Sequence, residues 1–214
     1  MSAAAPFKPP MPERIALPGP VGVLESVLEV PLGHDGRVAL ICHPHPLFGG
    51  TLQNKVVHTT ARALQERGIA TLRFNFRGVG ASAGTFDDGR GETDDALAAA
   101  DWLTARYPAS PLILAGFSFG AYVAYRVATE SPVQRLYTIA PPIRRFDFGS
   151  QRVPTMPWLV IQGDQDELVE YSSVVTWMAS VVPKPHLATI AGAEHFFHGR
   201  LNELKIVVQE FLDT

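Results

Sequence analysis

The chain has 214 residues, of which 46% are hydrophobic and 18% charged, and its formal net charge is −3. This composition is typical of one soluble globular domain, and the small net charge gives no indication of a nucleic-acid or membrane partner. The one cysteine excludes an internal disulfide framework.

The N-terminal residues 1–12 are rich in proline and lack the continuous apolar stretch of a signal peptide. Elsewhere, no apolar run approaches the roughly 20 residues that span a bilayer. We therefore expect a flexible tail over residues 1–12, a single domain over residues 13–214 and a cytoplasmic location.

Short apolar segments alternate with longer segments of helical periodicity after the tail, as in an α/β fold with a mostly parallel sheet covered by helices on both faces. Residues 14–30, broken by proline and glycine, predict an antiparallel hairpin. Further strands, read as covered on both faces, are expected at 38–43, 69–74, 112–116, 135–140, 158–162 and 186–190, about eight in all. Helices are expected at 56–66, 92–106, 119–130, 171–181 and 201–212.

The segment after the strand at 38–43 places Cys42, His43 and His45 close together. Imidazole and thiolate are good zinc ligands, so a metal-dependent hydrolase that uses His43 and His45 is one hypothesis. No nearby carboxylate or third histidine completes a ligand set in the sequence. We therefore expect no metal and no other cofactor, and we interpret Cys42 as a small core residue.

The loop after the strand at 69–74 contains Arg77, which either braces that loop through hydrogen bonds or lies on the surface. The helix that follows begins with Glu92, Asp94 and Asp95. Negative charge in a first turn is favoured by the helix dipole, so these carboxylates are given no catalytic role.

A serine between two glycines, Gly116-Phe117-Ser118-Phe119-Gly120, joins a predicted strand to a predicted helix. In such a sharp turn the serine side chain stands clear of the sheet, and side chains at the two glycine positions would collide. The amide of Phe119, at the helix N-terminus, is free to donate to a developing oxyanion. Ser118 is therefore a predicted nucleophile; the alternative is a glycine-rich turn with a serine cap.

A serine nucleophile needs a base and an acid that orients the base. Asp164 and Asp166 follow the strand at 158–162, and His195 and His198 follow the strand at 186–190. Because the carboxyl ends of parallel strands share one edge of a sheet, these side chains are expected near Ser118.

The order serine, aspartate, histidine resembles that of the α/β-hydrolases. More specifically, the sequence is similar to small lidless serine hydrolases that carry HPHPxxGG, RFNFRGVGxSxG, GFSFGA, GDxDxxV and GxxHFF, from about residue 37 to residue 197. The resemblance implies Asp166 as the acid and His195 as the base. Asp164 and His198 remain the alternatives.

The same resemblance implies a second oxyanion donor in the loop after residue 42. Pro44 and Pro46 have no amide hydrogen, so the donor must be a neighbouring residue. Alignment with relatives favours the amide of His45, followed by that of Leu47.

These features predict a carboxylesterase-type serine hydrolase that cleaves small or short-chain esters through an acyl-enzyme; a thioesterase or a peptidase would use the same triad. Only about sixteen residues, 141–156, separate two strands where lidded relatives insert a subdomain, so we expect an open site without a lid. Phe48, Phe117 and Phe196 are expected to line the substrate pocket. The partner is then a small-molecule ester, and the sequence gives no oligomeric state. Because the base must be neutral, activity is expected to fall below pH about 6.5.

Overall fold

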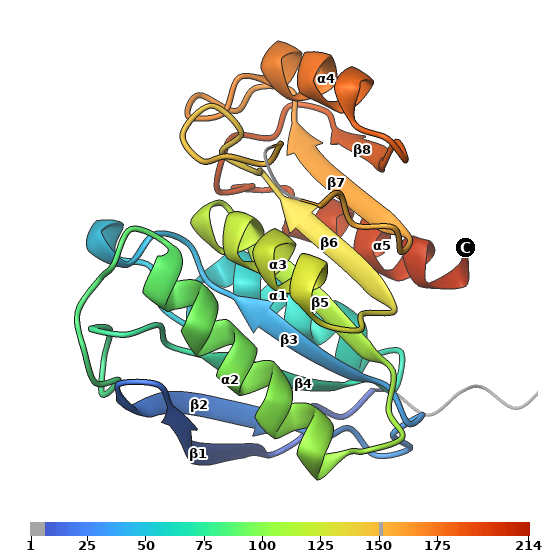
Figure 1. Cartoon of the computed structure of the whole chain (residues 1–214). Helices are drawn as coiled ribbons and strands as arrows, with labels where there is room; N and C mark the ends of the chain where they lie inside the picture. The colour runs from blue at the N-terminus through green and yellow to red at the C-terminus, as the bar shows by residue number, and fades with distance from the viewer. Residues whose placement is uncertain (1–6, 150–151) are drawn as a thin grey trace, which may run out of the picture.

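The computed structural model describes residues 7–149 and 152–214, and within them eight strands form one sheet in the order β1-β2-β4-β3-β5-β6-β7-β8 (Figure 1). The strands are β1 (Pro12–Gly19), β2 (Gly22–Glu29), β3 (Val38–Cys42), β4 (Ala70–Phe74), β5 (Leu112–Phe117), β6 (Arg135–Ile139), β7 (Trp158–Gly163) and β8 (His186–Ile190). β2 is antiparallel to both β1 and β4, and all other neighbours are parallel. The predicted mostly parallel sheet with an antiparallel first hairpin is confirmed.

The helices cover both faces of the sheet (Figure 1). α2 (Arg90–Arg106), α3 (Phe119–Glu130) and α4 (Tyr171–Ser180) pack on one face, and α1 (Lys55–Gln65) and α5 (Leu201–Glu210) pack on the other. Two short 3-10 turns, η1 (Pro46–Phe48) and η2 (Phe211–Asp213), complete the described elements. None of the described helices is both long enough and apolar enough to cross a membrane.

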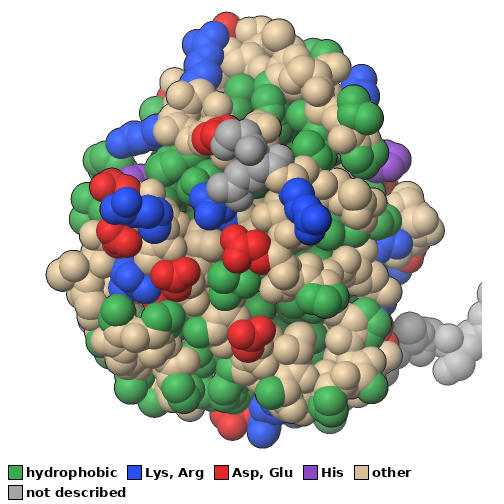
Figure 2. Space-filling view, in the orientation of Figure 1, with side chains coloured by type: hydrophobic (Ala, Val, Ile, Leu, Met, Phe, Trp, Pro, Cys, Tyr) green, Lys and Arg blue, Asp and Glu red, His purple; other side chains and the backbone are tan. Residues whose placement is uncertain are grey.

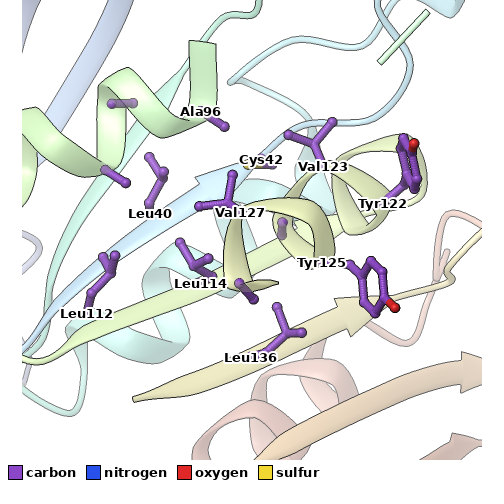
Figure 3. Packing of buried hydrophobic residues seen from close by; sticks show 14 of the residues in the cluster. Leu40, Cys42, Ala96, Leu112, Leu114, Tyr122, Val123, Tyr125, Val127 and Leu136 are labelled. Carbon is purple, nitrogen blue, oxygen red and sulfur yellow. The ribbon is translucent and has the colours of Figure 1, made fainter. Parts of the chain in front are cut away.

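Alternation along β5 shows why the central strands read as continuous apolar runs. Leu112 and Leu114 belong to the core under α2 and α3, whereas Ile113 and Phe117 belong to the core under α1 and α5. Figure 3 shows the first of these cores, where Val123 of α3 lies over the strands. Since both faces are covered, each strand needs apolar residues at odd and even positions.

β8 departs from the prediction that all later strands are covered on both faces. His186 and Leu187 are exposed, and only Ile190 of this strand is buried. The reason is position, because β8 is the last strand of the sheet and has a neighbour on one side only.

The predicted start of α1 is confirmed by its cap. The Asn54 side chain accepts hydrogen bonds from the amides of Val56 (2.9 Å) and Val57 (3.5 Å), which have no partner within the helix. Gly68 follows the helix end with a φ of 80°, a backbone conformation that glycine adopts without strain. These residues fix the direction in which the chain leaves and re-enters the sheet.

The loop after β4 is braced by a buried ion pair. Arg77 donates to the Asp95 carboxylate from Nε (3.0 Å) and Nη2 (2.8 Å), and both side chains are almost fully buried. Glu92 accepts from the amides of Asp87 (2.9 Å) and Gly89 (2.8 Å). Asp95 and Glu92 therefore anchor the loop to α2 through specific contacts, beyond any favourable interaction with the helix dipole.

The expected flexible tail lies partly outside the described residues, since residues 1–6 are not among them. The described part starts with Phe7, whose ring lies 4.2 Å from the guanidinium carbon of Arg62 on α1. Regular structure begins with β1 at Pro12. Flexibility over residues 1–12 stays a prediction.

Surface charge agrees with the nearly neutral composition. Figure 2 shows acidic and basic side chains interspersed over the face that carries α2, α3 and α4.

Candidate active site

Three side chains from distant parts of the chain meet at the edge of the sheet where the parallel strands end, the edge to which the arrowheads of β3, β6 and β7 point in Figure 1. Ser118 follows β5, Asp166 follows β7 and His195 follows β8. His195 Nε2 lies 3.1 Å from Ser118 Oγ, and His195 Nδ1 lies 2.9 Å from Asp166 Oδ2. The arrangement is a hydrogen-bonded chain of hydroxyl, imidazole and carboxylate.

Ser118 has a strained backbone, with φ 53° and ψ −118°. This combination is unfavourable for any residue with a Cβ, and it turns the chain sharply from β5 into α3. A Cβ on Gly116 would overlap the carbonyl of Gly120, and one on Gly120 would overlap the carbonyl of Cys42. Both flanking glycines are therefore required by close backbone packing, as the sequence predicted.

Asp166 is held as a carboxylate by a dense set of donors. Oδ1 accepts from the amides of Leu168 (2.9 Å) and Val169 (2.7 Å), and Oδ2 accepts from Nε2 of Gln162 (2.9 Å). Burial by itself raises the pKa of this carboxyl, but the hydrogen bond and charge of His195, with the two amides, outweigh it and lower the pKa. An ionised Asp166 fixes the tautomer of His195 that carries its proton on Nδ1.

Of these partners, Gln162 was missed from the sequence. It lies at the end of a strand that was assigned only to the core, and its side chain is fully buried. A polar residue inside an apolar run, four positions before an aspartate, was the available signal.

The two alternative partners lie elsewhere. Oδ1 of Asp164 accepts from the amide of Gly192 (2.7 Å), which holds the turn that follows β8. The side chain of His198 is 69% exposed and lies 3.6 Å from the carboxylate of Glu194. Neither residue contacts Ser118 within the described structure.

The start of α3 and the loop that contains His45 both border the pocket at Ser118. The amide of Phe119 begins α3, and the His45 loop reaches the same place, since the rings of His45 and Phe119 lie 5.0 Å apart. Among the described residues neither the amide of Phe119 nor that of His45 has an acceptor. The Leu47 amide, by contrast, donates to Nδ1 of His45 (3.2 Å).

His43 is a structural residue rather than a metal ligand. Its Nδ1 donates to the carbonyl of Pro44 (2.6 Å) and its Nε2 accepts from the amide of Phe76 (3.1 Å), so both nitrogens are engaged. Burial lowers its pKa to about 4, although the bond to Pro44 opposes the shift, and burial raises the pKa of the Cys42 thiol. Within the described chain, no three histidine, cysteine, aspartate or glutamate side chains could hold a metal ion. These residues do not fit the metal hypothesis.

A pocket of about 500 Å³ opens above Ser118 and His195. Phe48 and Phe196 line it, as predicted. Phe117 does not line the pocket. Its side chain belongs to the core on the face of the sheet that α1 and α5 cover, and it is 1% exposed. Its ring lies 5.1 Å from that of His195. Its assignment to the pocket was wrong.

Much of the pocket wall was not predicted. It comes from residues 142–146 after β6 and from residues 167–170 after β7, and it includes Arg144, Arg145, Phe146, Glu167 and Glu170. The charged residues of this wall carry no sequence motif. Their loops reach the pocket only through tertiary packing.

Comparison with known proteins gives matches over most of the chain. The family model described as X-Pro dipeptidyl-peptidase (S15 family) matches residues 23–154. A lidless α/β serine hydrolase from Xanthomonas campestris is 44% identical, with 97% of this chain and 96% of that chain covered and a TM-score of 0.91. An α/β serine hydrolase homologue from Coxiella burnetii is also 44% identical, with coverage of 94% and 97% and a TM-score of 0.91. An uncharacterised protein of Rickettsia prowazekii is 36% identical over 211 aligned residues, 94% of this chain and 89% of that protein.

The match to the family model has a boundary that matters for the site. Residues 23–154 include Ser118 and the three candidate oxyanion donors, but they end before Asp166 and His195. The two solved structures cover 97% and 94% of this chain, so the structural similarity extends well beyond the part that the family model matches.

Proposed function

The chain belongs to the α/β-hydrolase superfamily, in the family described as X-Pro dipeptidyl-peptidase (S15 family), and we propose that this hydrolase is a serine carboxylesterase for small or short-chain esters. One observation carries the proposal: Ser118, His195 and Asp166 form a continuous hydrogen-bonded chain at the floor of an open pocket. No cofactor is needed for this chemistry.

In the proposed reaction, His195 Nε2 takes the proton of Ser118 as Oγ attacks the ester carbonyl carbon. Asp166 stabilises the imidazolium that forms, and the same proton is then given to the departing alkoxide oxygen, which leaves as an alcohol. Water enters and attacks the acyl carbon while His195 Nε2 takes one of its protons; the imidazolium then gives this proton to Ser118 Oγ as the carboxylic acid leaves. The serine proton thus leaves with the alcohol, and a proton of the water restores the serine hydroxyl.

The tetrahedral oxyanion would be held by two backbone amides, those of Phe119 and His45. Both lack an acceptor among the described residues and are therefore available, whereas the Leu47 amide is already donating to His45. Removing one such donor typically slows turnover by about 10²–10³.

The shape of the pocket supports small esters. Phe48, Phe119, Phe146 and Phe196 give it apolar walls, and the short connection after β6 leaves no covering subdomain. An open site encloses little of a long acyl chain, so additional methylenes gain little burial.

A peptidase is the second candidate, because the matching family model is described by a peptidase activity. The proposed triad could serve amide hydrolysis as well, since the leaving amine would take its proton from the same imidazole. A thioesterase would also use these groups.

A substrate panel tests the proposal. Esters of para-nitrophenol with acyl chains from acetyl to dodecanoyl are compared with an acyl thioester and an X-Pro para-nitroanilide, with Ser118→Ala as the control for enzyme-independent hydrolysis. We expect the highest kcat/KM for the shortest acyl chains. Higher kcat/KM for the anilide, the thioester or the longest chains would contradict the proposal.

A further inference from the structure

Arg145 places a positive charge in the wall of the substrate pocket. It lies in the segment 141–149 after β6, it is exposed, and it lines the pocket together with Phe48. Its guanidinium carbon lies 5.4 Å from the centre of the Phe48 ring. A guanidinium over an aromatic face keeps its N–H groups directed outward around its rim, where a planar anion can bind.

The other charged groups of the pocket are already engaged. Arg144 pairs with Glu170 (3.1 Å), which also accepts from the hydroxyls of Ser172 (2.6 Å) and Ser173 (3.0 Å). Glu167 accepts from the amide of His195 (3.2 Å). No carboxylate within the described part of the chain forms an ion pair with Arg145, so no acidic side chain of the protein occupies its guanidinium N–H groups.

The charge of Arg145 also acts on His45, in the loop that borders the pocket beside Ser118. Burial first, and then the proximity of Arg145, lower the pKa of the His45 imidazole, while Asp88 opposes the shift. The His45 ring in turn contacts both Phe48 and Phe119, with ring centres 4.8 and 5.0 Å apart. Arg145 is therefore coupled to the part of the pocket that would hold the reacting carbonyl.

We propose that Arg145 binds a carboxylate of the substrate, so that the preferred esters carry an anionic group in their acyl or alcohol part. This inference rests on the esterase function proposed above and names its substrate class. The fork of N–H donors of an arginine matches a carboxylate in bidentate geometry, and such charge-assisted bonds are about twice as strong as neutral ones. Phe48 would limit the conformations of the guanidinium, and the apolar walls would bind the linking carbons.

Two pairs of esters test the proposal. The first pair is the para-nitrophenyl monoester of adipic acid and a neutral match in which an isopropyl group replaces the free carboxylate. The second pair carries the difference on the alcohol side, as para-carboxyphenyl and para-nitrophenyl hexanoate. For each pair the ratio of kcat/KM, anionic over neutral, is measured in the wild type and in Arg145→Gln, so that intrinsic reactivity cancels.

Arg135→Gln is the matched control. This arginine also lies over an aromatic ring, 5.2 Å from the centre of Phe211, but it begins β6 at the opposite end of the strand from the pocket. We expect Arg145→Gln to lower the ratio about tenfold for at least one pair, Arg135→Gln to leave both ratios unchanged, and added salt to weaken the wild-type preference.

The outcomes separate this proposal from the one on which it rests. If the anionic-to-neutral ratio of kcat/KM is the same in Arg145→Gln as in the wild type for both pairs, the role of Arg145 is overturned but the esterase function stands. An equal fall of the ratio in Arg135→Gln would also overturn it, because the effect would then not come from the pocket. Absence of turnover for all four esters would overturn both proposals.

Discussion

Nε2 of His195 lies 3.1 Å from Oγ of Ser118, although 77 positions separate the two residues in the chain. The contact depends on two strand ends that share one edge of the sheet, β5 before the serine and β8 before the histidine. It also depends on the positive φ of Ser118, which lifts the hydroxyl out of the sheet. The proposed proton transfer thus follows from sheet topology and from one strained residue.

Asparagine substitutions should show which of the two aspartates after β7 acts as the acid of the triad. Asp166→Asn keeps the shape of the side chain but removes the charge that stabilises the imidazolium, so we expect kcat to fall about 10³–10⁴-fold. Asp164→Asn is the matched control, because among the described residues the Asp164 side chain accepts only from the Gly192 amide; its kcat should change by less than about tenfold. Steady-state kinetics on one short-chain ester gives the answer, and the reverse pattern would reassign the acid.

The strain at Ser118 should be measurable as stability. Ser118→Gly removes the Cβ that makes φ 53° unfavourable, whereas Ser118→Ala removes only the hydroxyl and keeps the strain. After allowance for the greater freedom of glycine in the unfolded chain, we expect the glycine variant to exceed the alanine variant by about 1 kcal/mol in free energy of unfolding. Urea denaturation measures the difference, and equal stability would argue against a strained turn. Neither variant should hydrolyse esters.

Burial of His43 should make stability fall in mild acid. Its pKa is lowered to about 4 in the folded protein, against about 6.5 in an unfolded chain. The unfolded state therefore binds a proton between these values that the folded state does not. The contribution of neutral His43 is complete above pH about 6.5 and is lost progressively down to pH about 4.

The expected size is about 2 kcal/mol of unfolding free energy lost between pH 7 and pH 5 through this one residue. The His43→Gln variant lacks this buried imidazole. Its unfolding free energy should therefore change less between pH 7 and pH 5, even if the variant is less stable at both pH values. The difference between the two pH dependences, measured by urea unfolding, isolates His43 from the other histidines. Identical pH dependence in both proteins would show that burial does not suppress its protonation.

The order and type of the regular elements could be predicted because each carries a local signal. The caps of α1 and the apolar alternation of β5 lie in contiguous residues, and the bounds differ from the prediction by one or two residues only. β8 was interpreted less well, since an edge position is a property of the whole sheet and not of the residues His186–Ile190.

The residues brought together at the site could be named for a similar reason. Ser118, Asp166 and His195 each directly follow a strand or lie a few residues beyond its end, and parallel strands bring such positions to one edge. The pocket wall was harder to predict from the sequence. Phe117 could not be distinguished there from Phe48 and Phe196, and only the alternation of β5 places it in the core under α1 and α5. The contribution of Arg145 depends on the packing of a loop that no local pattern encodes, whereas the one signal for Gln162 is a polar residue inside an apolar strand.

The most direct test of the account is covalent labelling by a fluorophosphonate, followed by mass spectrometry of the digested protein. We expect one adduct, on Ser118, and a large loss of labelling rate in His195→Ala, since that imidazole activates the hydroxyl. His198→Ala should label at the wild-type rate, because that side chain faces solvent. An unlabelled Ser118 in active protein, or equal labelling rates in wild type and His195→Ala, would contradict the proposed nucleophile and base.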